Sequence, residues 1–206
     1  MPTLEGSDLA CVRGDRQLFK NVNFSLEAGG LMQVQGPNGS GKTSLLRMLC
    51  GLATPAHGEI RWDGSEIRSL GGAYFGAMTY LGHASGVKDD LTAIENLRIS
   101  SALSGSEIDE IKAHEALQRM GLGGRELLPA KVLSQGQRRR VTLARLLVCS
   151  TELWILDEPL TALDVAAVKL VQGLLEQHLG RGGMIVMTTH QEIEIAAVAT
   201  QRLQLA

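Results

Sequence analysis

The stretch Gly36-Pro37-Asn38-Gly39-Ser40-Gly41-Lys42-Thr43 decides the fold, because it matches the pattern G-x-x-x-x-G-K-[ST]. An extended apolar run, residues 31–34, precedes it, and a helical run begins near Ser44. Glycines let consecutive backbone N–H groups turn toward a polyphosphate, and the N-terminus of the next helix adds positive partial charge there. The stretch therefore predicts a nucleotide site that extends to Ser44, with Lys42 on the β- and γ-phosphates and the Thr43 hydroxyl on Mg²⁺.

The composition narrows the class of protein. A chain of 206 residues suffices for one domain with a sizeable core, and its net charge of −2 gives no basic footprint for nucleic acid. Cys11, Cys50 and Cys149 are far apart and form no C-x-x-C pair, which favours small core residues in a reducing cytosol over a zinc site or disulfides. We expect no secretory signal and no membrane-spanning segment, so any membrane role would come through a partner.

The order of the elements indicates an α/β fold with a mostly parallel core sheet. Short apolar runs at 152–156 and 184–187 are typical of buried parallel strands. Runs 9–12 and 18–26, the second of them alternating, are expected to form an antiparallel edge to that sheet. Further strands are predicted at 59–62 and 77–81, and the end of the chain, 191–206, is predicted as a short helix followed by a strand.

Helical patterns dominate the middle of the chain. The run 91–103 has Thr92 as its predicted N-cap, with Glu95 three residues later, and a second helix is predicted over 106–120. Another strongly helical run follows at 138–148. Such an insertion between strands of an α/β sheet predicts a separate helical lobe.

Two carboxylates, Asp157 and Glu158, follow the apolar strand 152–156. Asp157 is predicted to hold Mg²⁺, directly or through water, opposite Thr43, and Glu158 to polarise the attacking water. Read alone, such a pair could equally be a solvated turn. Its combination with the phosphate loop favours the second half of a nucleotide site.

Leu133-Ser134-Gln135-Gly136-Gln137, before a helix that begins with the three arginines 138–140, resembles the signature motif of ATP-binding-cassette ATPases. Residues 159–164, ending in Asp164, resemble the D-loop of that family, and His190 after an apolar strand resembles its switch histidine. These motifs and their order cover nearly the whole chain. The resemblance implies a P-loop NTPase fold of the ABC-ATPase type: one domain, 1–206, with a RecA-like core, an antiparallel β edge subdomain and the helical lobe at about 84–150.

The resemblance also implies that one chain holds only half of each site. In this family two cassettes pair head to tail, and each ATP lies between the phosphate loop of one copy and the signature of the other. Ser134 and the Gly136 backbone, with Gln135, Gln137 and Asp164, would then bind ATP held by a second copy. Alone, Ser134 could be an ordinary N-cap.

Two positions depart from the family pattern. His83 stands where a glutamine usually touches Mg²⁺ and the attacking water, so we expect it to act on Mg²⁺ through water, with a charge that depends on pH near neutrality. Arg13 stands where an aromatic residue usually stacks on adenine, and a guanidinium plane can also stack on a base. The alternatives are a structural histidine and a solvated turn arginine.

Several other residues have plainer interpretations. The three arginines 138–140 are predicted to form a solvated helix face that could also favour the ATP-bound dimer electrostatically. Trp154 is predicted to lie in the core despite its place next to the site. His57, His114 and His178 lack partners at metal spacing and are predicted to be surface residues.

Three functions compete. An ATPase subunit docked under membrane partners explains every motif. A soluble cassette ATPase of DNA repair or translation would be expected to carry long coiled coils or a second cassette, and a small P-loop kinase would leave the signature and His190 unexplained.

Local stretches resemble one subfamily, the ATP-binding subunit of the haem exporter of bacterial cytochrome c maturation. They are 81–83, 88–97, 137–141, 153–159 and 188–191. The resemblance implies a peripheral protein on the cytoplasmic face of the inner membrane, joined to integral membrane subunits of that maturation system. ATP hydrolysis would drive haem handling and release of a haem-loaded periplasmic chaperone, and segment 82–92 would couple the site to the membrane subunits. A transporter ATPase for another small substrate is the alternative.

Overall fold

The computed structural model describes residues 2–189, 195 and 200–205. The chain divides into two compact units. The first, called the core unit here, comprises Met1–Tyr80, Thr151–Glu158 and Leu175–Ala206. The second, the helical unit, comprises Leu81–Ser150 and Pro159–Leu174.

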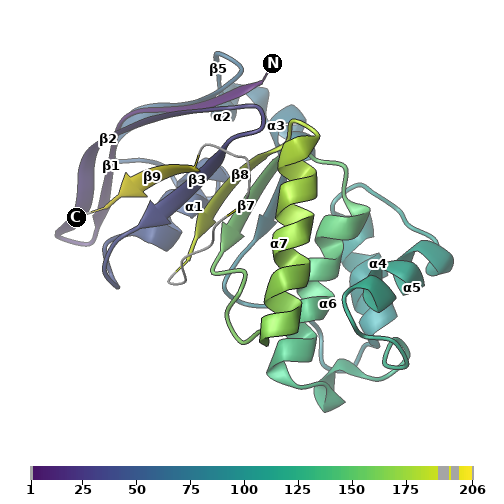
Figure 1. Cartoon of the computed structure of the whole chain (residues 1–206). Coiled ribbons are helices and arrows are strands. Elements are labelled where there is room, and N and C mark those ends of the chain that lie inside the picture. The colour runs from purple at the N-terminus through teal and green to yellow at the C-terminus, as the bar shows by residue number, and fades with distance from the viewer. Residues whose placement is uncertain (1, 190–194, 196–199, 206) are drawn as a thin grey trace. The chain divides into compact units, whose positions relative to one another are not determined.

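A five-stranded sheet organises the core unit (Figure 1). Its strands, in the order β6-β7-β8-β3-β9, are β6 (Met78–Leu81), β7 (Leu153–Asp157), β8 (Met184–Thr188), β3 (Leu31–Gln35) and β9 (Thr200–Gln204). β3 runs parallel to β8 and β9, and β7 runs parallel to β8. Every residue of β7 and β8 is buried, as their continuous apolar runs predicted. Because these strands are parallel, the carboxyl ends of β3, β7 and β8 meet at one edge of the sheet.

The antiparallel strands form a sheet of their own instead of an edge of the parallel sheet, which differs from the expectation. Their order is β2-β1-β4-β5, with β1 (Thr3–Arg13), β2 (Arg16–Glu27), β4 (His57–Trp62) and β5 (Ser65–Glu66). The reason lies in helix α1 (Lys42–Leu49), which buries Leu45, Leu46, Met48 and Leu49. These side chains join one apolar cluster with Phe24 of β2 and Val186 of β8, so the helix has apolar neighbours from both sheets.

Two short helices were missed in the sequence. They are α2 (Ile67–Leu70) and α3 (Gly72–Ala77), and β6 consequently begins at Met78, one residue later than predicted. Tyr74 of α3 is 1% exposed and its hydroxyl donates to the Leu49 carbonyl at 2.6 Å. This anchor comes from tertiary packing, and helices this short have too few residues to show a period.

The helical unit contains α4 (Ala93–Leu103), α5 (Glu110–Arg119), the 3₁₀ turn η1 (Ala130–Val132) and α6 (Gln135–Val148). The predicted capping box at the start of α4 is confirmed, because Thr92 Oγ1 accepts from Glu95 N and the Glu95 carboxylate accepts from Thr92 N. α5 starts later than predicted, since Asp109 caps it.

Helix α7 (Val165–Gly180) begins in the helical unit and ends in the core unit. Asp164 caps its first turn, with Oδ1 accepting from Ala167 N at 2.8 Å. At the end of the chain the predicted strand is present as β9, whereas the helix predicted before it lies largely outside the described residues. Among the residues that the structure describes, no helix is long and apolar enough to cross a membrane.

Candidate nucleotide site

The phosphate loop connects the end of β3 to the start of α1 in the core unit. Gly36 has φ 149°, and a Cβ there would lie 2.6 Å from the Leu205 carbonyl oxygen, so only glycine fits. α1 begins at Lys42, two residues earlier than predicted, and its N-cap Gly41 offers no side chain to the first turn. The N–H groups of that turn therefore have no side-chain acceptor from the N-cap, which is the arrangement that an anion at a helix N-terminus uses.

The Lys42 side chain lies within this loop. The residue is 9% exposed, and Nζ donates to the carbonyls of Gly36 at 2.7 Å and Pro37 at 3.1 Å. These two bonds hold the ammonium group inside the turn that the loop forms. The positive charge thus lies within the phosphate loop, and its contact with phosphates stays a prediction.

Thr43 and Asp157 meet at the carboxyl edge of the sheet. Thr43 Oγ1 donates to Asp157 Oδ2 at 2.9 Å, although the residues are far apart in the chain. Asp157 is 2% exposed. A hydroxyl and a carboxylate are the hard oxygen ligands that Mg²⁺ takes in proteins, so these side chains fit the predicted metal.

Thr188, at the end of β8, supports both carboxylate residues, and the sequence reasoning did not single it out. Its hydroxyl donates to Asp157 Oδ1 at 2.7 Å and accepts from the Glu158 N–H at 2.9 Å. Thr188 is completely buried. The available signal was a threonine at the carboxyl end of a strand expected to be parallel to the one that ends in Asp157.

The negative charge of Asp157 contributes to raised pKa values at two neighbouring side chains. Burial, and after it the Asp157 charge, raises the pKa of the Cys50 thiol well above its usual value. The same two causes, in the same order, raise the pKa of Tyr80 to about 12. A buried carboxylate that disfavours further negative charge nearby is a favourable place for a cation.

Glu158 stands directly after β7 in a conformation that a non-glycine residue rarely adopts, with φ 47°. Its backbone is held there by the bond to Thr188. Backbone strain of this kind costs free energy and tends to persist at functional sites. The side chain is half-buried.

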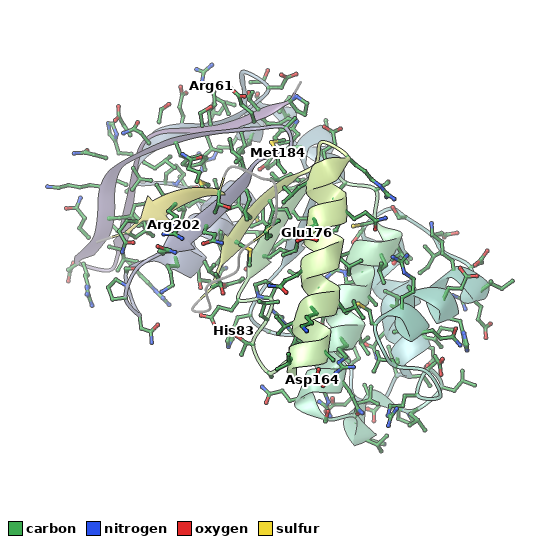
Figure 2. The ribbon with its side chains drawn as sticks, viewed as in Figure 1. Arg61, His83, Asp164, Glu176, Met184 and Arg202 are labelled. Carbon is green, nitrogen blue, oxygen red and sulfur yellow. The ribbon has the colours of Figure 1, made fainter. Side chains whose placement is uncertain are left out.

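The remaining predicted site residues lie elsewhere. Arg13 is exposed at the β1–β2 turn, and its place on a base remains a prediction. His83 is exposed in the segment after β6 and belongs to the helical unit, as does Asp164 at the start of α7 (Figure 2). Their roles toward ATP and Mg²⁺ remain predictions. His190 lies outside the described residues.

Ser134 is the N-cap of α6, the alternative that the sequence left open. Its Oγ accepts from Gln137 N at 3.2 Å, and the Gln137 side chain accepts from Ser134 N at 2.9 Å. Both residues take part in this capping box, while Gln135 is exposed. The cap fixes the start of the helix, and the anion-binding role of this motif stays a prediction.

Two plainer interpretations were wrong. Arg139 is 6% exposed and lies inside the helical unit instead of on a solvated face, because backbone carbonyls take up its N–H groups. His178 is half-buried and stacks on Trp154, with ring centroids 3.8 Å apart and an angle of 7° between the planes. Trp154 itself lies in the core, as predicted, with 4% exposure.

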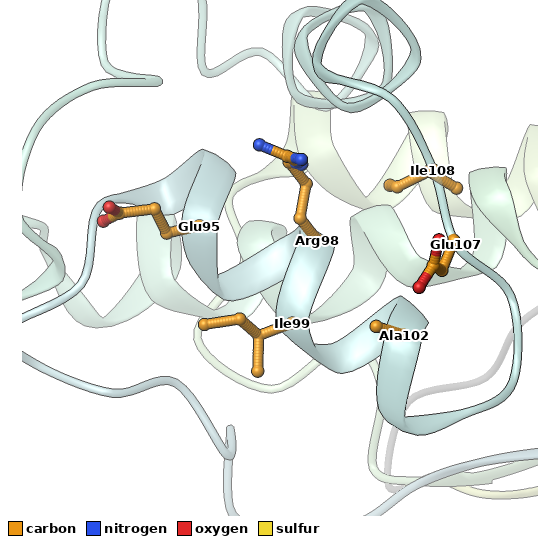
Figure 3. A pocket seen from close by; sticks show the side chains of 6 residues that line it. All are labelled: Glu95, Arg98, Ile99, Ala102, Glu107 and Ile108. Atoms are coloured by element: carbon orange, nitrogen blue, oxygen red, sulfur yellow. The ribbon is translucent and has the colours of Figure 1, made fainter.

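A hollow of about 380 Å³ lies along α4 in the helical unit, and none of the residues predicted for the nucleotide lines it (Figure 3). Its lining consists of Glu95, Arg98, Ile99, Ala102, Glu107 and Ile108. Glu95 is engaged in the α4 capping box, which lowers its pKa through the bonds from Thr92.

A phosphate loop that opens a helix, together with a buried aspartate at the end of a parallel strand of the same sheet, two positions away in the strand order, defines a P-loop nucleotide-binding protein. The model of the ABC transporter family matches residues 19–161. The chain is 84% identical, over the full length of both chains, to the cytochrome c biogenesis ATP-binding export protein CcmA of Nitrosospira multiformis. It therefore belongs to the ABC transporter family, and within it to the cytochrome c biogenesis ATP-binding export proteins.

Solved structures agree with the fold. An ABC transporter ATP-binding protein from Pyrococcus furiosus superposes with a TM-score of 0.83 at 27% identity, over 98% of this chain and 97% of that one. A dimeric ATP-binding cassette in a post-hydrolysis state, bound to ADP and phosphate, gives a TM-score of 0.79 at 24% identity, over 91% and 88% of the two chains.

Proposed function

We propose that this chain is the ATP-hydrolysing subunit of the membrane ABC transporter that handles haem in bacterial cytochrome c maturation. The observation that carries the proposal is the bonded set Thr43, Asp157 and Thr188 beside the buried Lys42. Membership of the cytochrome c biogenesis export proteins adds the biological context. A transporter for another small substrate and a soluble cassette ATPase are less well supported, because the similarity extends along the whole chain.

In this proposal each site residue of the core unit has its own role. Lys42 and the N–H groups at the start of α1 bind the β- and γ-phosphates, and Thr43 with Asp157 holds Mg²⁺. When bound, Mg²⁺ neutralises charge on the phosphate oxygens. Glu158 orients the attacking water, and Thr188 keeps its backbone in place.

Histidines complete the site. In this proposal His83 contacts the metal-bound water and His190 contacts the γ-phosphate. Arg13 stacks on the adenine base in place of an aromatic ring.

Two copies of the chain close two equivalent sites. Ser134, Gln135, Gly136, Gln137 and Asp164 of one copy face the ATP held by the phosphate loop of the other. A head-to-tail pair with two-fold symmetry satisfies both copies at once. The related cassette is a dimer, which supports the pairing of two copies.

Membrane subunits of the maturation system are the other partners. The chain lies at the cytoplasmic face of the inner membrane, bound to them, and ATP hydrolysis drives release of a haem-loaded periplasmic chaperone. Segment 82–92 transmits to the membrane subunits the movement by which the two copies close on ATP. Asn96 anchors the end of this segment, since its amide donates to the carbonyls of Lys88 and Leu91 and accepts from Lys88 N.

The phosphate site is tested by Lys42→Ala in the purified complex with its membrane subunits. Turnover should fall by on the order of 100-fold or more, because the negative charge on the transferred phosphate loses its contact with the Lys42 ammonium. Lys169→Ala removes an exposed lysine on α7 and should leave turnover unchanged. Equal rates in wild type and Lys42→Ala would refute the assignment.

The haem assignment is tested in cells. Deletion of the gene should abolish covalent c-type cytochromes, detected by haem staining after denaturing electrophoresis. The wild-type gene should restore them and the Lys42→Ala gene should not. Normal cytochromes in the deletion strain would argue for a different substrate, while leaving the ATPase assignment in place.

A further inference from the structure

A buried arginine in the signature helix α6 has contacts that the proposed function does not use. Arg139 is 6% exposed, and burial of a guanidinium is costly unless its donors are satisfied. Nε donates to the Pro159 carbonyl at 3.3 Å and Nη1 to the Gly82 carbonyl at 3.1 Å. All three residues belong to the helical unit. One side chain therefore joins α6 to two chain segments remote from it in sequence.

Both carbonyls belong to residues that adjoin one proposed to act on ATP. The Gly82 carbonyl is part of the peptide bond to His83, whereas the Pro159 carbonyl lies on the far side of the residue that follows Glu158. A shift of Arg139 would thus pull on the backbone that carries both residues. Arg139 itself lies two positions after Gln137, the last residue of the signature motif.

The same face of α6 holds the rest of the D-loop, residues 159–164. Gly136, Arg139 and Arg140 are spaced i, i+3 and i+4, so they lie on one side of the helix. A Cβ on Gly136 would lie 2.7 Å from the Ala162 carbonyl oxygen, and Arg140 Nη2 donates to Asp164 Oδ2 at 2.5 Å.

The D-loop has an unusual backbone conformation at Ala162, where Gly136 of α6 approaches it. Ala162 has φ 65°, a left-handed conformation that a non-glycine residue rarely adopts. With the bond from Arg139 to Pro159, the helix face contacts the loop at its beginning, middle and end. The D-loop and the signature helix are therefore held together as one body.

We infer that Arg139 is a positioning residue that couples the two ATP sites of the dimer. The inference rests on the proposed function, in which Glu158 and His83 act on ATP bound by their own chain while the signature acts on ATP bound by the partner. When α6 engages the partner's ATP, Arg139 carries its displacement to the carbonyls beside Glu158 and His83. Each site thereby senses whether the other is filled.

The chemistry requires arginine. A guanidinium offers five N–H donors in a rigid planar fork, so it can serve two carbonyls in different directions. A lysine at this position keeps the charge, but its donors all leave from one compact ammonium on a flexible stem, which does not reproduce the fork that reaches carbonyls of two separate segments. Arg139→Lys should therefore weaken the coupling without removing the buried charge, and Arg139→Met should remove both.

The test measures ATP turnover against ATP concentration in the purified complex with its membrane subunits. Wild type should show a Hill coefficient above 1. Arg139→Lys should bring it to about 1 and lower kcat by about 10-fold, while the Kd for a fluorescent ATP analogue stays within about 2-fold. Arg138→Lys alters the half-exposed neighbour, which pairs with Asp89 at 2.6 Å, and should keep the wild-type Hill coefficient.

A second measurement serves if Arg139→Lys hydrolyses ATP too slowly for its Hill coefficient to be determined. In the Glu158→Gln background, dimer formation against ATP concentration should be sigmoidal, and Arg139→Lys should make it hyperbolic. An unchanged Hill coefficient in Arg139→Lys, with or without a lower melting temperature, would overturn the inference, as would a wild-type coefficient of 1. Absence of ATP hydrolysis in wild type would instead refute the proposed function.

Discussion

At the scale of single residues, Thr188 bonds to both acidic residues of the candidate site, through the carboxylate of Asp157 and the backbone N–H of Glu158. Its hydroxyl donates to Asp157 and accepts from the Glu158 backbone, so one oxygen orients the proposed metal ligand and holds a strained peptide. Supporting groups of this kind usually matter for activity nearly as much as the ligands themselves.

We predict that Thr188→Val lowers ATP turnover by about 10- to 100-fold, since valine keeps the shape but removes the hydroxyl that bonds to Asp157 Oδ1 and to the Glu158 N–H. ATP affinity should change little, because Lys42 and the loop N–H groups are untouched. Steady-state hydrolysis and equilibrium nucleotide binding measure the two quantities.

The matched control is Thr79→Val. Thr79 is 7% exposed and its hydroxyl pairs with Thr151 at 2.7 Å, so the variant also removes a buried hydroxyl from the same sheet. Turnover should stay near wild type. Equal losses in the two variants would mean that Thr188 contributes only to folding.

Which residues the sequence could predict depends on how their contacts are encoded. Lys42, Thr43 and Asp157 belong to contiguous motifs whose chemistry can be read directly. Thr188 acts across two neighbouring strands, and its contact depends on the register that places Asp157 opposite it. Arg139 was predicted to be solvated because its charge suggested a surface, whereas the carbonyls that hold it come from two distant loops.

At the scale of elements, strand predictions agreed with the structure wherever the apolar run is long or is bounded by turns. The short helices α2 and α3 were missed because tertiary anchors such as Tyr74 hold them. The antiparallel sheet was predicted as an edge because alternation reveals a buried face without revealing what covers it. In this chain α1 lies against that face.

Helix α7 offers a direct test of stability. Gly173 lies within this helix, is exposed, and a Cβ there would meet nothing within 4 Å. Gly173→Ala should stabilise the protein by about 0.5–1 kcal/mol, because alanine loses less backbone freedom on folding. Chemical denaturation measures the free energy of unfolding, and a loss of stability would contradict the assigned helix.

The end of α7 introduces a pH dependence. Burial lowers the pKa of His178 below its ordinary value near 6.5, with Arg181 adding to the effect and backbone bonds opposing it. Above about pH 6.5 the residue is neutral in both states, so its contribution to stability is complete. As the pH falls below that value, the unfolded chain binds a proton that the folded chain resists, and stability is lost.

We therefore predict that His178→Phe, which keeps an aromatic ring beside Trp154 but cannot titrate, loses less stability than wild type on acidification. The comparison needs melting temperatures at about pH 7.5 and about pH 5.5. Parallel losses in the two proteins would show that His178 does not titrate in this range. His57→Phe changes an exposed histidine and serves as the control.

At the scale of the whole molecule, the proposed site is complete only in a pair of chains. Glu158→Gln should bind ATP and hydrolyse it slowly, because the amide cannot accept a proton from the attacking water. The variant should therefore accumulate as a dimer with ATP and elute as a monomer with ADP on a sizing column. Adding Ser134→Arg, which puts a bulky side chain on the signature, should abolish the dimer.

Persistence of the monomer in Glu158→Gln with ATP would contradict the head-to-tail arrangement. A dimer that forms equally with ADP would point to an interface that does not depend on the γ-phosphate. Only the fold and the family are independent of this outcome, because they rest on the sheet topology and on the similarity along the chain.

The stack of His178 on Trp154 has an optical consequence. The chain has two tryptophans, Trp62 in the antiparallel sheet and Trp154 in the parallel one. An imidazole in face-to-face contact with an indole can quench its fluorescence, and a protonated imidazole quenches more strongly. The emission of Trp154 should therefore report the charge of His178, while that of Trp62 reports the antiparallel sheet, so each sheet carries its own built-in fluorophore.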